Sequence, residues 1–211
     1  VFDMDDTLYK EYYYKKSGLK EVLKTLKKNL GFSFKIDLKS LMLIDKPFQY
    51  IIEKLTLPAN YLNYLKWTYR LHKPNIKLNK KNKSFINYLS KKSAGVAILT
   101  DGRSFSQRQK LKSIGLIKFP FYISEEYNDT KLQSKRYKII MKTFSADNYV
   151  YVGDNLNKDF VVPNKLNWLT IGLRNSKLNI HSPKKKLPKI FYPKKWINNI
   201  YDLKNINFHM L

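Results

Sequence analysis

The first eight residues, Val1-Phe2-Asp3-Met4-Asp5-Asp6-Thr7-Leu8, decide the fold of this chain. Two apolar residues lead directly into a D-x-D-x-T-L run, a pattern that indicates a buried strand ending in a cluster of carboxylates. The chain has 16 acidic residues among 211, and three of them occur between positions 3 and 6. Like charges at this spacing repel, so the cluster costs free energy unless a cation or a shared proton offsets the repulsion. Asp and Thr are also common at strand ends and helix caps, so this stretch alone leaves a structural role open.

The second half of the chain alternates between short apolar runs and helical patterns. We expect strands in four segments, residues 95–100, 119–123, 149–152 and 168–171. Helices are expected between them, and a last helix is expected at about residues 194–203. Together with the opening strand, this alternation predicts an α/β fold, a doubly wound, Rossmann-like parallel sheet.

Residues 12–78 differ from the rest because only helical patterns occur there. Ser17 is expected to cap the first helix, and Pro47 suits the first turn of the third. The sequence therefore predicts two domains: a sheet-containing core of residues 1–11 and 79–211, and an inserted all-helical domain of residues 12–78.

The composition limits the classes of function. The chain has no cysteine, which excludes disulfides, thiolate metal sites and a thiol nucleophile. No apolar run approaches the ~20 residues that span a bilayer, so we expect no membrane partner. A cytoplasmic location is the expectation, because a chain without cysteine suits a reducing compartment.

The formal net charge of +25 has two explanations. A basic chain can bind nucleic acid or another polyanion. However, the lysines are spread along the chain and occur with many Asn, Ile, Tyr and Phe residues, whose codons are rich in A and T. We therefore expect a generic basic surface without a specific nucleic-acid partner.

Polar side chains follow the expected strands at the edge where their carboxyl ends meet. The first strand delivers Asp3 and Asp5, the second delivers Thr100, and a later one delivers Asp154 followed by Asp159. Lys131 comes just after the strand that ends near Ser124. Several carboxylates without a soft ligand favour a hard cation, most simply Mg²⁺. A lysine and a threonine hydroxyl suit phosphoryl oxygens, so the set predicts a phosphoryl-transfer site.

Four motifs in this order resemble those of the haloacid dehalogenase superfamily, and the resemblance covers nearly the whole chain. The four stretches that carry it are Phe2 to Tyr9, Ile98 to Arg103 with the helix that follows, Ser124-Glu125-Glu126 with Lys131, and Val152 to Asn155 with Asp159. The inserted helical domain resembles the alpha-helical cap of this superfamily, which implies a lid over the site. Asp5 implies phosphate chemistry rather than halide chemistry, because true dehalogenases carry a different residue there.

The resemblance also implies roles for individual residues. Asp3 would be the nucleophile that forms an aspartyl-phosphate, and Asp5 the general acid and base. Mg²⁺ would be held by Asp3, the main-chain carbonyl of Asp5 and Asp154, with support from Asp159. Thr100 and Lys131 would bind the phosphoryl group, and the expected substrate contacts also include Thr7, Asp101, Gly102 and Arg103. For Arg103, a surface ion pair is an equally good explanation.

The function expected from this resemblance is a Mg²⁺-dependent phosphatase acting on a small phosphorylated metabolite, such as a sugar phosphate or a nucleotide. Two alternatives stay open. One is a phosphomutase, and the other is a basic nucleic-acid-binding protein on the same scaffold. The sequence does not indicate the substrate or the oligomeric state.

Overall fold

A computed structural model describes residues 1–31, 33–174, 178–179 and 186–206. The chain divides into two compact units, residues 1–11 with 77–211, and residues 12–76. Neither unit contains a described helix that is long and apolar enough to cross a membrane.

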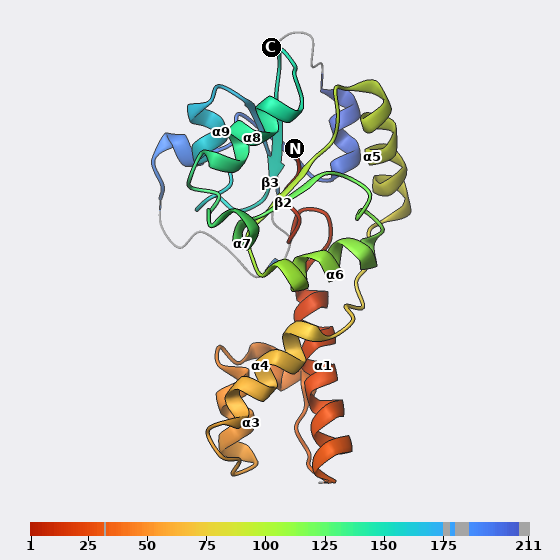
Figure 1. Ribbon diagram of the computed structural model, residues 1–211, viewed down its shortest axis with the longest axis vertical. Coiled ribbons are helices and arrows are strands. Elements are labelled where there is room, and N and C mark those ends of the chain that lie inside the picture. Colours follow the sequence, from red (N-terminus) through yellow and green to blue (C-terminus); the bar gives the residue numbers. More distant parts are fainter. Residues whose placement is uncertain (32, 175–177, 180–185, 207–211) are drawn as a thin grey trace. The chain divides into compact units, whose positions relative to one another are not determined.

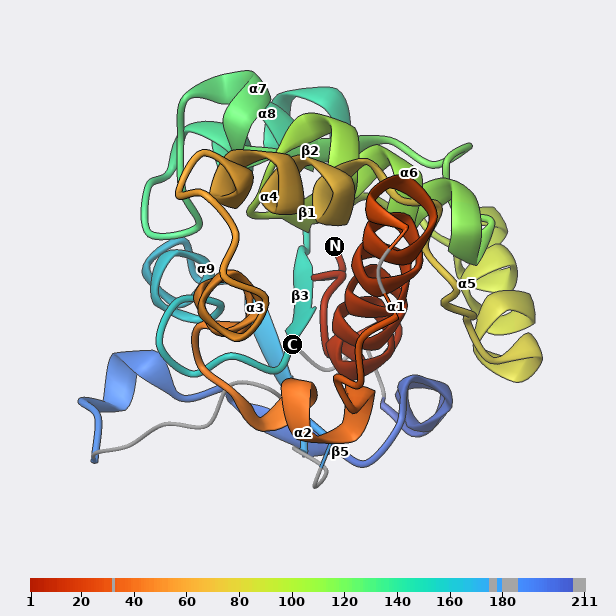
Figure 2. The same cartoon turned by 90° about the horizontal axis from the view of Figure 1, so that it is seen from below.

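The first unit is built around parallel strands (Figures 1 and 2). The strands are β1 (Ile98–Thr100), β2 (Phe121–Ile123), β3 (Val150–Gly153), β4 (Leu169–Leu173) and β5 (Lys195–Ile197). Parallel pairs join β1 to β2, β3 to β4, and β4 to β5. Phe2 forms parallel bridges to both Ile98 and Val152, so the opening segment lies between β1 and β3 and joins the two groups of strands. The prediction of an α/β fold with a parallel sheet is confirmed.

Helices connect the strands and cover both faces of the sheet. They are α5 (Lys80–Lys92), α6 (Ser104–Ile114), α7 (Ser124–Tyr127), α8 (Lys135–Thr143), α9 (Val161–Lys165), and the 3₁₀ helices η1 (Lys189–Phe191) and η2 (Ile200–Asn205). Both views place α9 and α5 on opposite faces of the sheet. Aromatic side chains fill much of the core, where Tyr137, Tyr151 and Trp168 are almost fully buried. Burial of such side chains is the main source of stability for this unit.

The helical unit contains α1 (Glu11–Leu30, which begins at the end of the opening segment), α2 (Leu38–Leu43), α3 (Pro47–Lys54) and α4 (Tyr61–Leu71). Its core is formed by six fully buried aliphatic side chains: Leu19, Val22, Leu26, Leu41, Ile51 and Leu65. Three of them follow the three- to four-residue spacing of one face of α1. Pro47 occupies the first turn of α3, where the missing N–H costs nothing.

Two predictions about local structure are wrong. Ser17 does not cap α1, because the helix already begins at Glu11 and Ser17 donates to the carbonyl of Tyr14 inside it. The helix expected at residues 194–203 is instead strand β5 followed by η2. A buried Ile197 completes the edge of the sheet, and Asn199 then forms a capping box with Asp202 that starts η2.

Candidate active site

The backbone of the opening segment brings the polar strand ends together. The N–H of Asp3 donates to the carbonyl of Val152 at 2.8 Å, and the N–H of Leu99 donates to the carbonyl of Phe2 at 2.9 Å. Residues 1–3 therefore run parallel to β1 and β3, with which they are hydrogen-bonded. Thr100 ends β1 and Asp154 follows β3, so both reach the same edge of the sheet as Asp3.

Three carboxylates gather at this edge. Asp3, Asp154 and Asp159 each place an oxygen within 4.8 Å of the other two, and all three residues are buried. The Lys131 ammonium donates to Oδ1 of Asp3 and to Oδ1 of Asp159, the latter at 2.7 Å. We refer to these four residues as the carboxylate cluster. The structure thus brings together three predicted metal ligands and the predicted phosphate-binding lysine.

The turn after β3 fixes Asp159 in the cluster. Its Oδ2 accepts hydrogen bonds from the backbone N–H groups of Asp154 (3.1 Å) and Asn155 (2.8 Å). A Cβ atom at Gly153 would lie 2.6 Å from the same oxygen, so a side chain there would displace Asp159. This explains why glycine ends β3.

Thr7, which follows the opening segment, connects two of the carboxylates. Its hydroxyl Oγ1 lies 3.0 Å from Oδ2 of Asp3 and 3.3 Å from Oδ1 of Asp154. Asn179 reaches the second oxygen of Asp154, to which its amide donates at 3.0 Å. The sequence predicted a substrate contact for Thr7, whereas nothing in the sequence pattern indicated Asn179.

Burial and crowding change the protonation of the cluster. Burial, with the neighbouring carboxylate of Asp159, raises the pKa of Asp3 to about 7, although Lys131 opposes the shift. Burial and the charges of Asp159 and Asp3 raise the pKa of Asp154 to about 9. Burial alone would lower the pKa of Lys131, but Asp159 and Asp3 raise it above its ordinary value. One ammonium therefore serves three carboxylates, and additional positive charge would be stabilised here.

The donor set fits a divalent metal ion. All three possible ligands are carboxylates, and this group is the cluster of potential metal ligands found in the described part of the chain. Oxygen-only ligands match the preference of Mg²⁺, which is commonly held by one or two carboxylates together with phosphate oxygens. Asp3 and Asp154 would hold the ion, while Asp159 is already occupied by Lys131 and two backbone N–H groups.

Replacing Lys131 by Met should strongly destabilise the metal-free protein, because it leaves buried carboxylates without their ammonium. We expect the free energy of unfolding in EDTA to fall by about 3–5 kcal/mol. Denaturant titration measures this change, and Lys142→Met, an exposed lysine of α8, provides the control. A loss below about 1 kcal/mol, which is typical of surface substitutions, would contradict the assigned contacts.

The carboxylate of Asp5 lies in a separate environment. The Lys110 ammonium contacts Oδ1 at 2.8 Å and Oδ2 at 3.1 Å, and Gln107 donates to Oδ2 at 3.1 Å. The Tyr9 hydroxyl also donates to Oδ1. Burial raises the pKa of Asp5, but Lys110 and the hydrogen bonds from Lys110, Tyr9 and Gln107 together lower it below its ordinary value. Asp5 is therefore held as a carboxylate by three donor side chains that do not belong to the carboxylate cluster.

The last residue of β1 and the three residues that follow it have different environments. Thr100 is almost fully buried and accepts a hydrogen bond from Gln107 at 3.1 Å. The carboxylate of Asp101 pairs with Arg136 at 2.7 Å, and Gly102 adopts a φ of +147°, which favours glycine. Arg103 is 64% exposed and pairs with Glu125 at 2.9 Å, the ion pair that the sequence left as an alternative. Substrate contacts by Asp101, Gly102 and Arg103 stay predictions.

Arg136 is a structural residue that the sequence did not indicate. Its side chain is completely buried and donates to the carbonyls of Thr100 (2.9 Å) and Tyr122 (3.1 Å). It also pairs with Asp101 and Asp129, so it ties the ends of β1 and β2 together. Its position in α8 gives no sequence signal, because basic residues are frequent throughout this chain.

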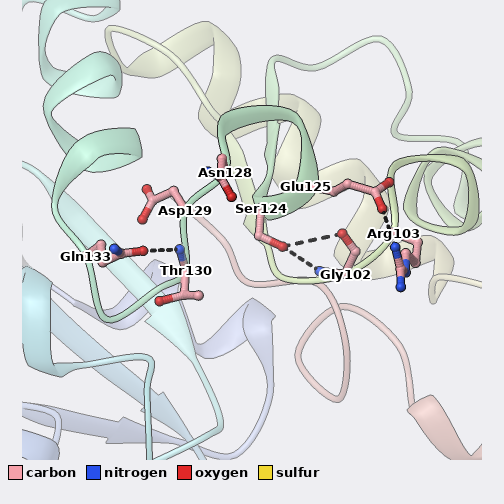
Figure 3. Close-up of a pocket in the computed structure, with 8 residues that line it drawn as sticks. All are labelled: Gly102, Arg103, Ser124, Glu125, Asn128, Asp129, Thr130 and Gln133. Carbon is pink, nitrogen blue, oxygen red and sulfur yellow. Dashed lines mark hydrogen bonds and ion pairs between the residues drawn. The ribbon is translucent and has the colours of Figure 1, made fainter.

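A surface pocket of about 610 Å³ adjoins these loops (Figure 3). It is lined by residues of the loop after β1, of α7 and of the segment between α7 and α8: Gly102, Arg103, Ser124, Glu125, Asn128, Asp129, Thr130 and Gln133. The hydroxyl of Ser124 accepts a hydrogen bond from the N–H of Gly102 at 2.8 Å, and the N–H of Thr130 donates to the side-chain oxygen of Gln133 at 2.9 Å. None of the lining residues belongs to the carboxylate cluster. The pocket is therefore not the place where the predicted metal ligands meet.

Comparison with known families gives one match. Residues 1–172 match the model of the family described as haloacid dehalogenase-like hydrolase. This range includes every residue of the carboxylate cluster. No curated protein sequence matches the chain.

Solved structures share the fold at low sequence identity. YfnB from Bacillus subtilis, in a structure bound to magnesium, is 19% identical, with a TM-score of 0.63 over 97% of this chain and 95% of that one. A 2-haloacid dehalogenase from Pseudomonas syringae pv. Tomato DC3000 is 14% identical, with a TM-score of 0.60 over 97% and 95%. A HAD phosphatase from Thermococcus onnurineus is 18% identical, with a TM-score of 0.58 over 97% and 94%. At these identities, the comparisons establish the fold alone.

Proposed function

Since the chain belongs to the haloacid dehalogenase-like hydrolase family, we propose that it is a Mg²⁺-dependent phosphatase of a small phosphorylated metabolite. The observation that carries this proposal is the arrangement of Lys131 between Asp3 and Asp159, next to Asp154. An ammonium within a carboxylate cluster provides a site for a dianionic phosphoryl group and its counterion. The separate carboxylate of Asp5 supports a proton-transfer role beside it.

In the first step, an oxygen of Asp3 attacks phosphorus while the bond from phosphorus to the leaving oxygen breaks. Asp5 enters this step carrying the proton that it took from water in the preceding turnover, gives it to that oxygen, and the product alcohol leaves. Asp3 then carries an acyl phosphate. Lys131 and Thr100 hold the phosphoryl oxygens and stabilise the charge that spreads over them.

In the second step, water attacks phosphorus and the bond from phosphorus to Asp3 breaks. Asp5 accepts the proton of this water, inorganic phosphate leaves, and the Asp3 carboxylate is restored. This step requires the carboxylate form of Asp5, the form that Lys110 stabilises. A bound Mg²⁺ would supply charge neutralisation for the phosphoryl group throughout.

Selection of the substrate is assigned to the helical unit. We propose that residues 12–78, by the boundaries expected from the sequence, form the cap domain of this family member. Phosphomutases use the same aspartyl-phosphate and differ in the acceptor, so the released product separates the two activities.

We expect the protein to hydrolyse p-nitrophenyl phosphate and release inorganic phosphate in the presence of Mg²⁺. EDTA should abolish turnover, and an excess of Mg²⁺ should restore it. Without the ion, the single positive charge of Lys131 cannot balance the negative charges of the three carboxylates and of the phosphoryl group. The measurement is a colorimetric assay with a dialysed control. Activity that survives complete chelation would contradict the metal assignment.

A further inference from the structure

One face of α6 carries two polar side chains that reach Asp5. Gln107 and Lys110 lie three residues apart, so they project from the same side of the helix. Gln107 is 2% exposed and Lys110 is 4% exposed. Lysine is among the residues that are least often buried, and a buried ammonium requires a partner.

The contacts of both side chains converge on one carboxylate. Lys110 contacts both oxygens of Asp5, at 2.8 and 3.1 Å, which restricts rotation of the carboxylate about its last bond. Gln107 donates to Oδ2 of Asp5 at 3.1 Å, and the same nitrogen lies 3.1 Å from Oγ1 of Thr100 and 2.6 Å from the carbonyl of Asp101. Gln107 therefore connects Asp5 with the residue assigned to phosphate binding.

A purely structural role explains this arrangement poorly. Removing charges from water costs much of what a buried ion pair gains, so such pairs contribute little to stability compared with apolar residues. A proton-transfer group, in contrast, must be held within hydrogen-bonding reach of the reacting oxygen, and small displacements cost rate. The α6 contacts meet that requirement.

We infer that Gln107 and Lys110 are positioning residues that hold Asp5 for proton transfer. This inference rests on the proposed function, since it assumes that Asp5 moves the proton. Neither residue has to touch the substrate: both act through the carboxylate of Asp5, and Gln107 also aligns it with Thr100.

A double-mutant cycle between Asp5 and Lys110 tests this inference. Lys110→Met should lower kcat by about 10–100-fold for phenyl phosphate, less than the ~10²–10⁴-fold that an acid-base group itself contributes, because Asp5 is still present. The loss of kcat/KM, which reports the steps up to release of the leaving group, should be smaller for p-nitrophenyl phosphate, whose leaving oxygen needs less protonation, and KM should change less than about threefold. In the Asp5→Asn background, Lys110→Met should change kcat by less than about twofold, because the group that it positions is absent.

Matched controls come from the same helix. Lys112→Met, at an exposed position, is the control for Lys110→Met, and Gln109→Leu, at a partly buried position, is the control for Gln107→Leu. Both controls should keep wild-type kinetics. Gln107→Leu should show the leaving-group dependence of Lys110→Met, and Lys110→Arg should recover part of the activity. An equal loss of kcat/KM for both substrates, or a Lys110→Met effect that is undiminished in the Asp5→Asn background, would overturn the inference.

Thermal unfolding of the four proteins of the cycle gives a readout that does not require turnover. These proteins are the wild type, Asp5→Asn, Lys110→Met and the double variant. Either single substitution removes one charge of the ion pair and leaves the other, so the double variant should unfold at a higher temperature than additivity predicts. Additive unfolding temperatures would overturn the inference whether or not the protein is a phosphatase. Absence of wild-type phosphatase activity, by contrast, would overturn the proposed function.

Discussion

Replacing Asp3 by Asn is expected to lower turnover of p-nitrophenyl phosphate by about 10⁴-fold or more. The amide that results is a poor nucleophile, and no other carboxylate can replace it. Asp154 lies on the adjacent strand end, and Asp159 is held by Lys131 and two backbone N–H groups. The phosphoenzyme should disappear together with turnover.

The control for Asp3→Asn is Asp147→Asn, which changes an exposed acid outside the cluster and should keep wild-type turnover. Steady-state kinetics at saturating Mg²⁺ measure both variants, and thermal unfolding shows that the Asp3 variant is folded. Near-normal turnover by a folded Asp3→Asn protein would rule out covalent catalysis by this residue.

Replacing Asp5 by Asn should have the second largest effect, a loss of about 10²–10⁴-fold in turnover. The variant lacks the group that protonates the leaving oxygen and then activates water. With an aryl phosphate, the substitution should slow hydrolysis of the phosphoenzyme more than its formation. The leaving oxygen of this substrate needs little protonation, so Asp3 should still be phosphorylated, whereas hydrolysis of the acyl phosphate should be slow.

This difference can be measured in a single experiment. Rapid mixing of Asp5→Asn with excess p-nitrophenyl phosphate should release a burst of p-nitrophenol that is close to the enzyme concentration, followed by a slow phase. An alkyl phosphate should give no burst, because formation of the phosphoenzyme also requires the acid. Equal loss with both substrates and no burst would contradict a proton-transfer role for Asp5.

The sheet and the carboxylate cluster could be predicted because their signals are local. Apolar runs followed by Asp3, Thr100 and Asp154 mark strand ends, and parallel topology alone brings such ends to one edge. Lys131 could be predicted only from its place in a motif, since a single lysine in a chain with 41 basic residues carries no signal.

The surroundings of the site depend on tertiary contacts that the sequence does not reveal. The rotation of α6 decides that Lys110 reaches Asp5 while Lys112 is exposed, and lysines at both positions look alike in the sequence. Arg136 is completely buried because the carbonyls at the ends of β1 and β2 need a donor. The local pattern around β5 predicts a helix, but the pairing of this segment with β4 outweighs that pattern.

The most direct test of the proposed mechanism is the location of the phosphoryl group in the Asp5→Asn variant. The protein is mixed with p-nitrophenyl phosphate and Mg²⁺, quenched in acid, digested and analysed by mass spectrometry. We expect one added phosphoryl mass on the peptide that contains Asp3, and none in the Asp3→Asn, Asp5→Asn double variant. A phosphoryl mass on any other peptide, or its persistence in the double variant, would show that Asp3 is not the nucleophile.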